Sequence, residues 1–219
     1  VITLSKSSSD EIKDNNIGNG KIFIVNPGIE FYKFKSIKKS KDPSILFLNR
    51  IKKYKGIIIF LDAANILSNK KINFIIAGSG DYLKEAVNYT KNNNINQVKF
   101  LGRVSEEKKN ELMQKSWVFV NTSYKEGWGI VNIEANYFKT PVVGSNVSGI
   151  KDSVINGKTG LLFEYGNSKE LAKDILYLVE NKKQLKKMSE NSRKWALKFN
   201  WDKKAKEYIG ILNKILNKN

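Results

Sequence analysis

The chain has 219 residues, 41% of them hydrophobic, and carries a net charge of +18 from 39 Lys and Arg against 21 Asp and Glu. It contains neither Cys nor His, which excludes disulfides, a Cys nucleophile, a Ser-His-Asp triad and the usual zinc sites, and which fits a reducing, cytoplasmic compartment. Chemistry must therefore come from carboxylates, Lys, Arg, Tyr and backbone dipoles, and no apolar run approaches the roughly 20 residues of a membrane span.

The first 42 residues predict short elements and a linker. A strand is predicted at 1–4, a helix that starts at the serines 7–9, a polar break at 15–20 and a second strand at 21–25. The second strand ends at Asn26-Pro27-Gly28, which is turn chemistry. A Lys-rich linker follows at 31–42, and we expect its interleaved aromatic side chains to pack it onto the protein.

From residue 44 onward, short apolar runs alternate with longer helical patterns. Strands are predicted at 45–48, 72–77, 98–101, 117–120, 141–144 and 161–163, and helices at 57–67, 82–92, 106–115, 130–138 and 150–155. The run 57–61 fits a buried strand equally well, but its continuation through Ala63, Ala64 and Leu67 favours a helix. Regular alternation predicts an α/β fold: a doubly wound, Rossmann-like parallel sheet with helices on both faces, whose ligand lies at the C-terminal ends of the strands.

Three basic helices are predicted to close the chain, at 168–180, 182–198 and 202–216. Lysine pairs recur there at helical spacing, at 182–183, 186–187 and 203–204, and allow three interpretations: a solvated helix face, contact with an anionic membrane surface, or contact with nucleic acid. Nucleic acid is the least favoured, because no recognised nucleic-acid motif accompanies the charge. We therefore expect a cytoplasmic protein, which under the membrane interpretation is peripheral at the membrane.

The loop between the strand 117–120 and the helix 130–138 combines glycines with two acids. Gly127 and Gly129 allow a tight turn, and the helix that begins near Ile130 directs free N–H groups at the same point, which suits a phosphate. Glu126 and Glu134 flank this corner, and ionised carboxylates accept hydrogen bonds from hydroxyl groups. A nucleotide sugar carries both phosphates and hydroxyls; the alternative is one solvated loop acid and one helix acid favoured by the dipole.

Two cations and two further glycines follow other predicted strands. Arg50 and Lys55 lie in the loop after 45–48, where they can bind a diphosphate or simply be surface bases of a Lys-rich protein. Gly78 and Gly80 follow 72–77 as a plausible phosphate or ribose contact, but Ala77-Gly78-Ser79-Gly80 is not a G-x-G-x-x-G fingerprint, so dinucleotide binding is not supported. No cluster of spaced carboxylates resembles a Mg²⁺ site, so we expect no metal and no cofactor.

An ordered set of motifs resembles the C-terminal, donor-binding domain of GT-B glycosyltransferases of the retaining "group 1" type. The resemblance spans roughly residues 21–201. The matching segments are Asn49-Arg50 through Lys55-Gly56, Ala77-Gly78-Ser79-Gly80, Phe100-Leu101-Gly102-Arg103-Val104, the E-x7-E from Glu126 to Glu134, Pro141-Val142-Val143, Gly149-Ile150 and Asn156-Gly157-Lys158-Thr159-Gly160-Leu161-Leu162.

The resemblance implies one half of a GT-B fold and a set of residue roles. Arg50 and Lys55 would bind the donor diphosphate, Glu126 would contact the sugar, and these three would form the catalytic set. Glu134 would hold the ribose hydroxyls, and Val104 would give main-chain contacts to the base. The remaining donor-binding positions are Gly78, Gly80, Gly127, Trp128, Gly129 and Ile130. The substrate would be a UDP-, GDP- or ADP-sugar, and the acceptor a saccharide or a lipid-linked one.

The resemblance also implies a division of the chain. Residues 1–20 would be the remnant of an N-terminal acceptor domain that is otherwise missing, 21–201 the donor domain, and 202–219 a C-terminal helix. Three departures stand out: Asn26-Pro27-Gly28-Ile29-Glu30 replaces the usual N-G-V-D, and Asn49 and Lys139 stand where Gly is common. These departures leave the four charged positions intact and put in question the hinge near Asn26 and the helix end at Lys139.

Three other functions compete with a glycosyltransferase. A sugar-nucleotide epimerase of the same architecture would release nucleotide and altered sugar without an acceptor. A hydrolase using Glu126 and Glu134 as a carboxylate pair is less favoured, because Arg50 and Lys55 would then have no role. A basic nucleic-acid-binding domain would respond to salt and heparin but not to a nucleoside diphosphate.

Overall fold

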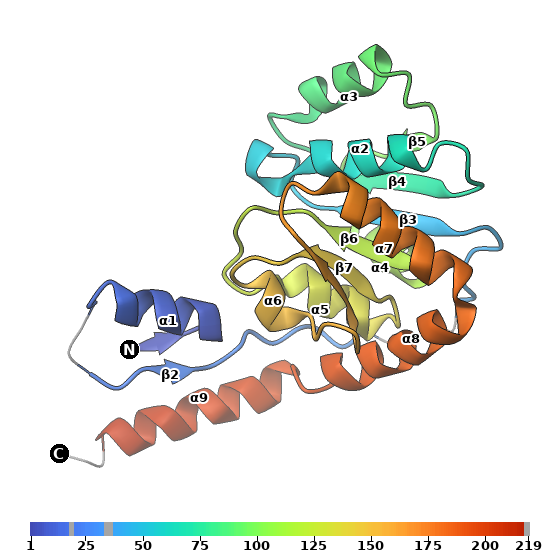
Figure 1. The fold of residues 1–219 in the computed structure, drawn as a ribbon. Helices are drawn as coiled ribbons and strands as arrows, with labels where there is room; N and C mark the ends of the chain where they lie inside the picture. The colour runs from blue at the N-terminus through green and yellow to red at the C-terminus, as the bar shows by residue number, and fades with distance from the viewer. Residues whose placement is uncertain (18–19, 33–36, 217–219) are drawn as a thin grey trace.

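A computed structural model of the chain describes residues 1–17, 20–32 and 37–216. Parts of the predicted polar break at 15–20, of the linker at 31–42 and of the tail at 202–219 lie outside these residues. Within the described ranges, a parallel sheet with helices on both faces occupies most of the molecule (Figure 1), which confirms the predicted fold class.

Six parallel strands form the central sheet, and each was predicted from sequence. They are β3 (Ser44–Leu48), β4 (Asn73–Ala77), β5 (Val98–Phe100), β6 (Val118–Asn121), β7 (Val142–Ser145) and β8 (Gly160–Phe163). Their order is β5-β4-β3-β6-β7-β8, with Phe47 of β3 paired in register with Ile76 on one side and Val120 on the other. The central strands are apolar on both faces, as expected where helices cover a parallel sheet on both sides.

The helices divide between the two faces of the sheet. The first face carries α2 (Ile57–Ile66), α3 (Leu83–Asn92) and α7 (Ser168–Glu180). The second carries α4 (Glu106–Lys115), α5 (Ile130–Tyr137) and α6 (Ile150–Ser153), and α8 (Lys182–Ala196) contributes buried residues to both. The ambiguous run 57–61 is therefore a helix, because Ile57, Phe60, Leu61 and Ala64 recur at helical spacing and are all buried.

Two apolar clusters, one on each face, hold these layers together. Successive strand residues point to opposite faces, so Ile45 and Phe47 enter the first cluster while Leu46 enters the second. In the first cluster the ring of Phe60 lies 5.5 Å from that of Phe47 and 5.7 Å from that of Phe74. Helix α2 is thus fixed over β3 and β4, which sets the position of the loop that precedes it.

Helix α6 is shorter than the predicted 150–155. It ends at Ser153 because Val154 is extended, with φ −110° and ψ 118°, and because the N–H of Ile155 bonds instead to Oγ1 of Thr159 at 2.9 Å. The side-chain hydroxyl of Thr159 thus replaces a helical acceptor and starts the turn that leads into β8.

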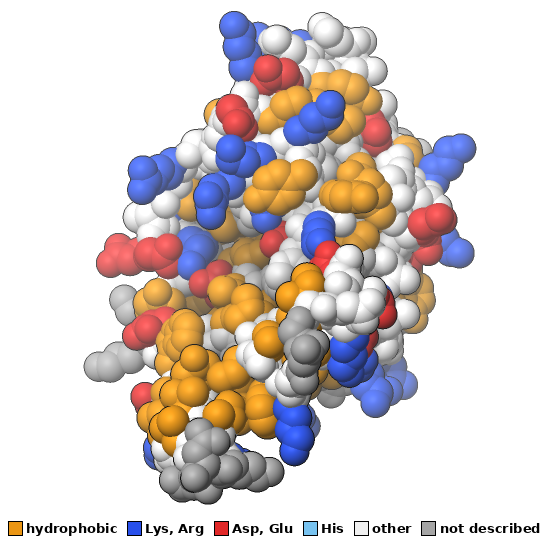
Figure 2. All heavy atoms as spheres, turned by 90° about the vertical axis from the view of Figure 1, so that its left-hand side faces the viewer, with side chains coloured by type: hydrophobic (Ala, Val, Ile, Leu, Met, Phe, Trp, Pro, Cys, Tyr) orange, Lys and Arg blue, Asp and Glu red, His pale blue; other side chains and the backbone are white. Residues whose placement is uncertain are grey.

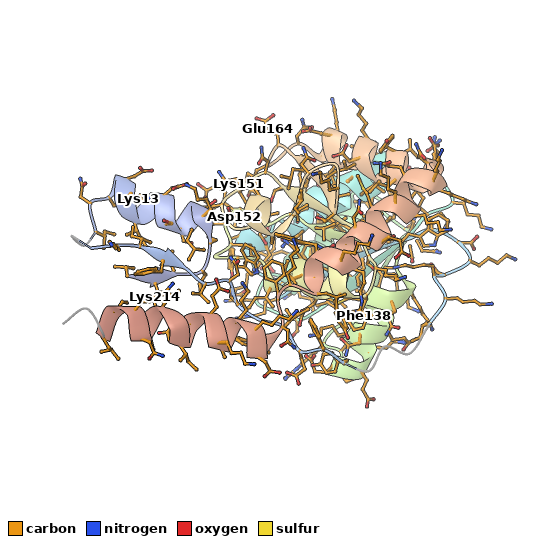
Figure 3. The ribbon with its side chains drawn as sticks, turned by 90° about the horizontal axis from the view of Figure 1, so that it is seen from below. Lys13, Phe138, Lys151, Asp152, Glu164 and Lys214 are labelled. Carbon is orange, nitrogen blue, oxygen red and sulfur yellow. The ribbon has the colours of Figure 1, made fainter. Side chains whose placement is uncertain are left out.

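The two ends of the chain lie together, beside the main sheet. β1 (Ile2–Thr3) and β2 (Phe23–Ile24) pair in parallel, α1 (Lys6–Asp14) connects them, and α9 (Trp201–Leu216) runs alongside (Figures 1 and 3). The predicted start of α1 among the serines 7–9 is wrong, because Ser5 is the N-cap: its side chain accepts a hydrogen bond from the N–H of Ser8. The predicted boundary after residue 20 falls between the paired strands, and the domain division stays a prediction.

Asp152 joins this terminal unit to the main sheet's helices. Its carboxylate accepts hydrogen bonds from the N–H groups of Ser7 in α1 and Gly149 before α6, both at 3.2 Å (Figure 3). A hollow of about 440 Å³ lies between β1, residues 25–27 after β2, and α9, and hydrophobic side chains gather on this lower part of the molecule (Figure 2). Among the described helices, none is long and apolar enough to span a bilayer.

The order of the strands reverses at the centre of the sheet. From β3 the chain first winds outward through β4 and β5, and then returns to place β6 on the other side of β3. The helices that follow β3 and β6, α2 and α5, cover opposite faces of the sheet, and in doubly wound sheets ligands bind at the C-terminal ends of the strands where the order reverses.

Candidate functional site

The loop after β3 is bound tightly to the loop after β6. Lys53–Lys55 form a 3-10 turn that ends at Gly56, whose φ of 67° and ψ of 29° are left-handed. A Cβ at Gly56 would lie 2.1 Å from the carbonyl oxygen of Thr122, so this close approach requires glycine. Thr122 in turn donates its hydroxyl to the carbonyls of Lys55 and Gly56, each at 2.9 Å. The two loops are thus held as one unit across the strand reversal.

Lys55 and Glu126, predicted from separate motifs, meet at this junction. Nζ of Lys55 lies 2.5 Å from Oε1 of Glu126, and the two side chains are only 9% and 16% exposed. The hydroxyl of Ser123 donates to the same carboxylate oxygen at 2.8 Å. The buried cation and the half-buried carboxylate therefore neutralise each other.

A buried amide network fixes the start of α5 behind this pair. Asn121 Nδ2 donates to Asn132 Oδ1 at 3.0 Å, and Asn132 Nδ2 donates to Ser153 Oγ at 2.9 Å, with all three residues fully buried. Gly129 adopts a φ of 79° just before the helix, and a Cβ there would lie 2.7 Å from Asn132 Nδ2. The N-terminus of α5 is consequently fixed at the C-terminal edge of the sheet, where its dipole favours an anion.

Glu134 also has a lysine partner, one that the sequence reasoning missed. Nζ of Lys109, in the first turn of α4, lies 2.9 Å from Oε1 of Glu134 and 2.7 Å from Oε2 of Glu106. Burial opposes the charge of Lys109, but Glu134 and Glu106 outweigh it and hold the lysine's pKa above its usual value. The only signal in the sequence is the spacing of Glu106 and Lys109, three apart on one helix face, which is common on solvated helices.

A cavity of about 390 Å³ opens beside Lys109 and holds three of the predicted residues, Arg50, Gly78 and Val104. Gly78 has a φ of 138°, and a Cβ there would lie 1.9 Å from the carbonyl oxygen of Asn49. Arg103 and Glu106, which the sequence reasoning did not select, also face it. The full lining is Leu48, Asn49, Arg50, Ala77, Gly78, Ser79, Arg103, Val104, Glu106 and Lys109. Its volume lies within the range of small-molecule sites.

The other predicted positions contribute backbone or packing. The indole of Trp128 is 5% exposed and packs 5.3 Å from the ring of Phe199, so its side chain belongs to the core. A Cβ at Gly80 would lie 2.3 Å from the carbonyl oxygen of Ile51, which makes this glycine a requirement of loop packing. Ile130, the first residue of α5, is 43% exposed, and Gly127 has only a distant contact with Leu4. Direct ligand contact by these four residues stays a prediction.

These groups give the site two kinds of chemistry. Arg50, Lys55 and the start of α5 can stabilise negative charge, while Glu126 and Glu134 can accept hydrogen bonds from hydroxyl groups. The described residues hold no group of three or more carboxylates placed to bind a metal ion. The absence of a metal and of a cofactor stays a prediction.

Comparison with known proteins identifies a family model that matches most of the chain. The model described as "Glycosyl transferases group 1" matches residues 28–195. An uncharacterized glycosyltransferase of Methanocaldococcus jannaschii is 33% identical over 158 residues, which cover 72% of this chain and 44% of that protein. The N,N'-diacetylbacillosaminyl-diphospho-undecaprenol alpha-1,3-N-acetylgalactosaminyltransferase of Campylobacter jejuni is 25% identical, covering 98% of this chain and 60% of that protein. The chain thus spans between 44% and 60% of the length of these two relatives.

Solved structures share the fold at low sequence identity. Sucrose-phosphate synthase of Thermosynechococcus elongatus superposes with a TM-score of 0.88 at 22% identity, covering all of this chain and 59% of that one. Anabaena HepE, crystallised with UDP and glucose, gives a TM-score of 0.84 at 22% identity, covering 98% of this chain and 63% of that one.

Proposed function

The chain belongs to the group 1 glycosyl transferases, and we propose that it forms the donor-binding domain of a transferase for a nucleotide-diphosphate sugar. The observation that carries the proposal is the pairing of Lys55 with Glu126 where the loops after β3 and β6 meet, at the point where the strand order reverses. Arg50 lines the 390 Å³ cavity together with Lys109, the partner of Glu134. Cations suited to a diphosphate and carboxylates suited to sugar hydroxyls thus occur in loops and helices at one edge of the sheet.

We assign to each residue the role that the family resemblance implies. Arg50 lies on the wall of the 390 Å³ cavity and can bind diphosphate oxygens with its planar guanidinium. Lys55 shares that task once the ligand draws it from Glu126, which is then free to accept a sugar hydroxyl. Glu134, held by Lys109, accepts the ribose hydroxyls, and the backbone at Val104 contacts the base.

Catalysis in this proposal is electrostatic. As the bond between sugar and diphosphate breaks, negative charge builds on the departing diphosphate, and Arg50, Lys55 and the start of α5 stabilise it. Retention of anomeric configuration and independence from a metal ion are parts of the same proposal. HepE, a structural neighbour, has been crystallised with UDP-glucose, and UDP is accordingly the first donor nucleotide to test, ahead of GDP and ADP.

The acceptor side of the reaction is proposed to lie largely outside these residues. The Campylobacter relative is named for an acceptor on diphospho-undecaprenol, a lipid-linked saccharide, and a saccharide or lipid-linked acceptor is proposed here too. We place the protein in the cytoplasm, peripheral at the membrane if its lysine-rich surface contacts anionic lipid. An N-terminal acceptor domain would complete the cleft.

The test separates phosphate recognition from nucleoside recognition. Calorimetry measures UDP and uridine binding to Arg50→Ala, Glu134→Gln and the control Lys71→Ala, whose side chain is 85% exposed and pairs with Asp42. Arg50→Ala should weaken UDP at least tenfold and uridine by less than twofold, because its partner is phosphate. Glu134→Gln should weaken both alike, and Lys71→Ala neither.

If Arg50→Ala lowers the affinity for UDP and for uridine by the same factor, the assignment of Arg50 to the diphosphate is contradicted. If none of UDP, GDP and ADP binds the wild-type protein, the donor-domain proposal falls. Sugar release in an altered form without any acceptor would favour an epimerase.

A further inference from the structure

A second hollow, of about 760 Å³, opens at the same edge of the sheet and has no role in donor binding as proposed above. Four tyrosines line it, and they come from the loops after four different strands: Tyr54 after β3, Tyr82 after β4, Tyr124 after β6 and Tyr165 after β8. Lys52, Lys53 and Asp81 complete the lining. We refer to these seven residues as the tyrosine pocket.

The tyrosine rings are exposed to an extent that packing alone does not explain. Tyr124 is 61% exposed, Tyr54 46% and Tyr165 38%, and the rings of Tyr124 and Tyr165 lie edge to face with centroids 5.2 Å apart. Figure 2 looks onto this edge of the sheet, and its upper half shows hydrophobic side chains interspersed with Lys and Arg. Exposed aromatic clusters rimmed by polar groups typically mark binding sites.

Backbone hydrogen bonds fix the loops around the tyrosine pocket. The N–H of Tyr124 donates to the carbonyl of Tyr54 at 2.8 Å, and the N–H of Tyr82 donates to the carbonyl of Ile51 at 3.0 Å. The loops after β3, β4 and β6 are therefore tied to one another. A ligand would meet preformed walls, and the entropy cost of ordering them on binding would be small.

The charge of the pocket favours an anionic ligand. Lys52 pairs with Asp81 at 3.1 Å, but the two side chains are 42% and 71% exposed, so this pair is weak and a ligand can displace it. Lys53 has no ion-pair partner among the described residues. Two lysines are thus available at the rim against one acid.

Tyr54 connects the pocket to the donor site. Nζ of Lys55 lies 5.0 Å from the centre of the Tyr54 ring and 2.5 Å from Glu126, the proposed sugar-contacting carboxylate. Lys55 thus contacts both a wall of the tyrosine pocket and the carboxylate that is proposed to contact the donor sugar.

We propose that the tyrosine pocket binds an oligosaccharide that carries anionic groups, as an acceptor subsite on the donor domain; this rests on the function proposed above. Sugar rings present C–H faces that pack against tyrosine rings, their hydroxyls bond to Tyr hydroxyls and Asp81, and carboxylate or phosphate substituents pair with Lys52 and Lys53. Single-stranded nucleic acid also stacks on aromatic rings, but the 64° angle between Tyr124 and Tyr165 offers no platform for successive parallel bases.

The experiment compares two oligosaccharides of equal length, hexagalacturonate, which carries carboxylates, and neutral maltohexaose. Calorimetry measures their dissociation constants, and that of UDP, for the wild-type chain, Tyr124→Ala, Tyr165→Ala, Lys53→Glu and the control Tyr177→Ala. Tyr177 lies on α7, outside the pocket lining, and is 46% exposed, like Tyr54. Tyr124→Phe, which keeps the ring, reports whether a loss in Tyr124→Ala comes from stacking.

Hexagalacturonate should bind more tightly than maltohexaose. Tyr124→Ala and Tyr165→Ala should each weaken it at least tenfold, Tyr124→Phe less than threefold, and Tyr177→Ala not at all. Lys53→Glu, a surface change that leaves the rings in place, should abolish the preference for the anionic chain. The affinity of every variant for UDP should stay within twofold of the wild-type value.

The inference is overturned if neither oligosaccharide binds at millimolar concentration, or if the tyrosine substitutions leave the dissociation constants of the oligosaccharides unchanged. If oligothymidylate alone binds in a tyrosine-dependent manner, the pocket is a nucleic-acid site and the inference is likewise overturned. UDP binding is measured on the same samples. Failure of oligosaccharide binding with UDP binding intact therefore removes the pocket's role alone, whereas loss of UDP binding removes the proposed donor function.

Discussion

The ion pair between Lys55 and Glu126 makes a quantitative prediction about the stability of the protein. Lys55→Met leaves a carboxylate that is only 16% exposed without its cation, although Ser123 still donates to it. Breaking a buried pair costs about 3 to 5 kcal/mol, and the remaining hydroxyl donor places this case near 3 kcal/mol. Glu126→Gln instead leaves Lys55 without its carboxylate partner and should lower the free energy of unfolding by about as much.

The double variant Lys55→Met/Glu126→Gln removes both charges and should cost less than the sum of the single changes by about 2 kcal/mol. Urea denaturation at pH 7 and low salt, followed by circular dichroism, gives the four free energies of unfolding. The control cycle uses Lys70 and Glu180, whose side chains are 42% and 60% exposed, and should show coupling below about 0.5 kcal/mol. If the cost of the double variant equals the sum of the two single costs to within about 0.5 kcal/mol, the pairing of Lys55 with Glu126 is refuted.

Three further predictions concern other parts of the chain. Burial, reinforced by the charge of Lys139, lowers the pKa of Lys39 to about 7. Because Lys39 keeps its proton above pH 7 only in the unfolded chain, the free energy of unfolding should rise by about 2 kcal/mol from pH 7 to 9. Parallel plots of this free energy against pH for the wild type and Lys39→Met would contradict the prediction. Lys139 has a left-handed φ of 58°, so Lys139→Gly should stabilise the protein by about 0.5 kcal/mol in urea denaturation, and a loss of stability would contradict the strain. Finally, these 219 residues should bind UDP equally with and without EDTA yet transfer no labelled sugar to an acceptor extract; multiple turnovers would show that the site is complete within them.

The fold was largely predictable because its elements have strong local signals. The strands of the central sheet are short apolar runs, and Gly56, Gly129 and Gly149 adopt the positive φ expected of glycine at tight turns. Lys139 shows that a departure in sequence need not change the backbone: the position keeps a left-handed φ although lysine replaces the common glycine.

The ion pairs of the site were harder to predict, because they depend on distances between elements. Glu134 was assigned to a ligand, but nothing in the local sequence indicates that Lys109, from the neighbouring helix, reaches it. The family resemblance gives Trp128 as a donor-binding position, but its indole is large and apolar, and the side chain is buried in the core. The end of α6 at Ser153 depends on the hydroxyl of Thr159, six residues later, and helical periodicity in the sequence does not predict this contact.

The mutual neutralisation of Lys55 and Glu126 also bears on which small anions can compete for the site. In the proposed function, sulfate would offer Lys55 a charge but has no hydroxyl to donate to Glu126, so it would leave this carboxylate with Ser123 as its donor in place of the lysine. A diphosphate sugar, bound as proposed above, would supply both partners at once. The pairing of Lys55 with Glu126 would therefore discriminate against an anion without hydroxyl groups, before any shape or base recognition comes into play.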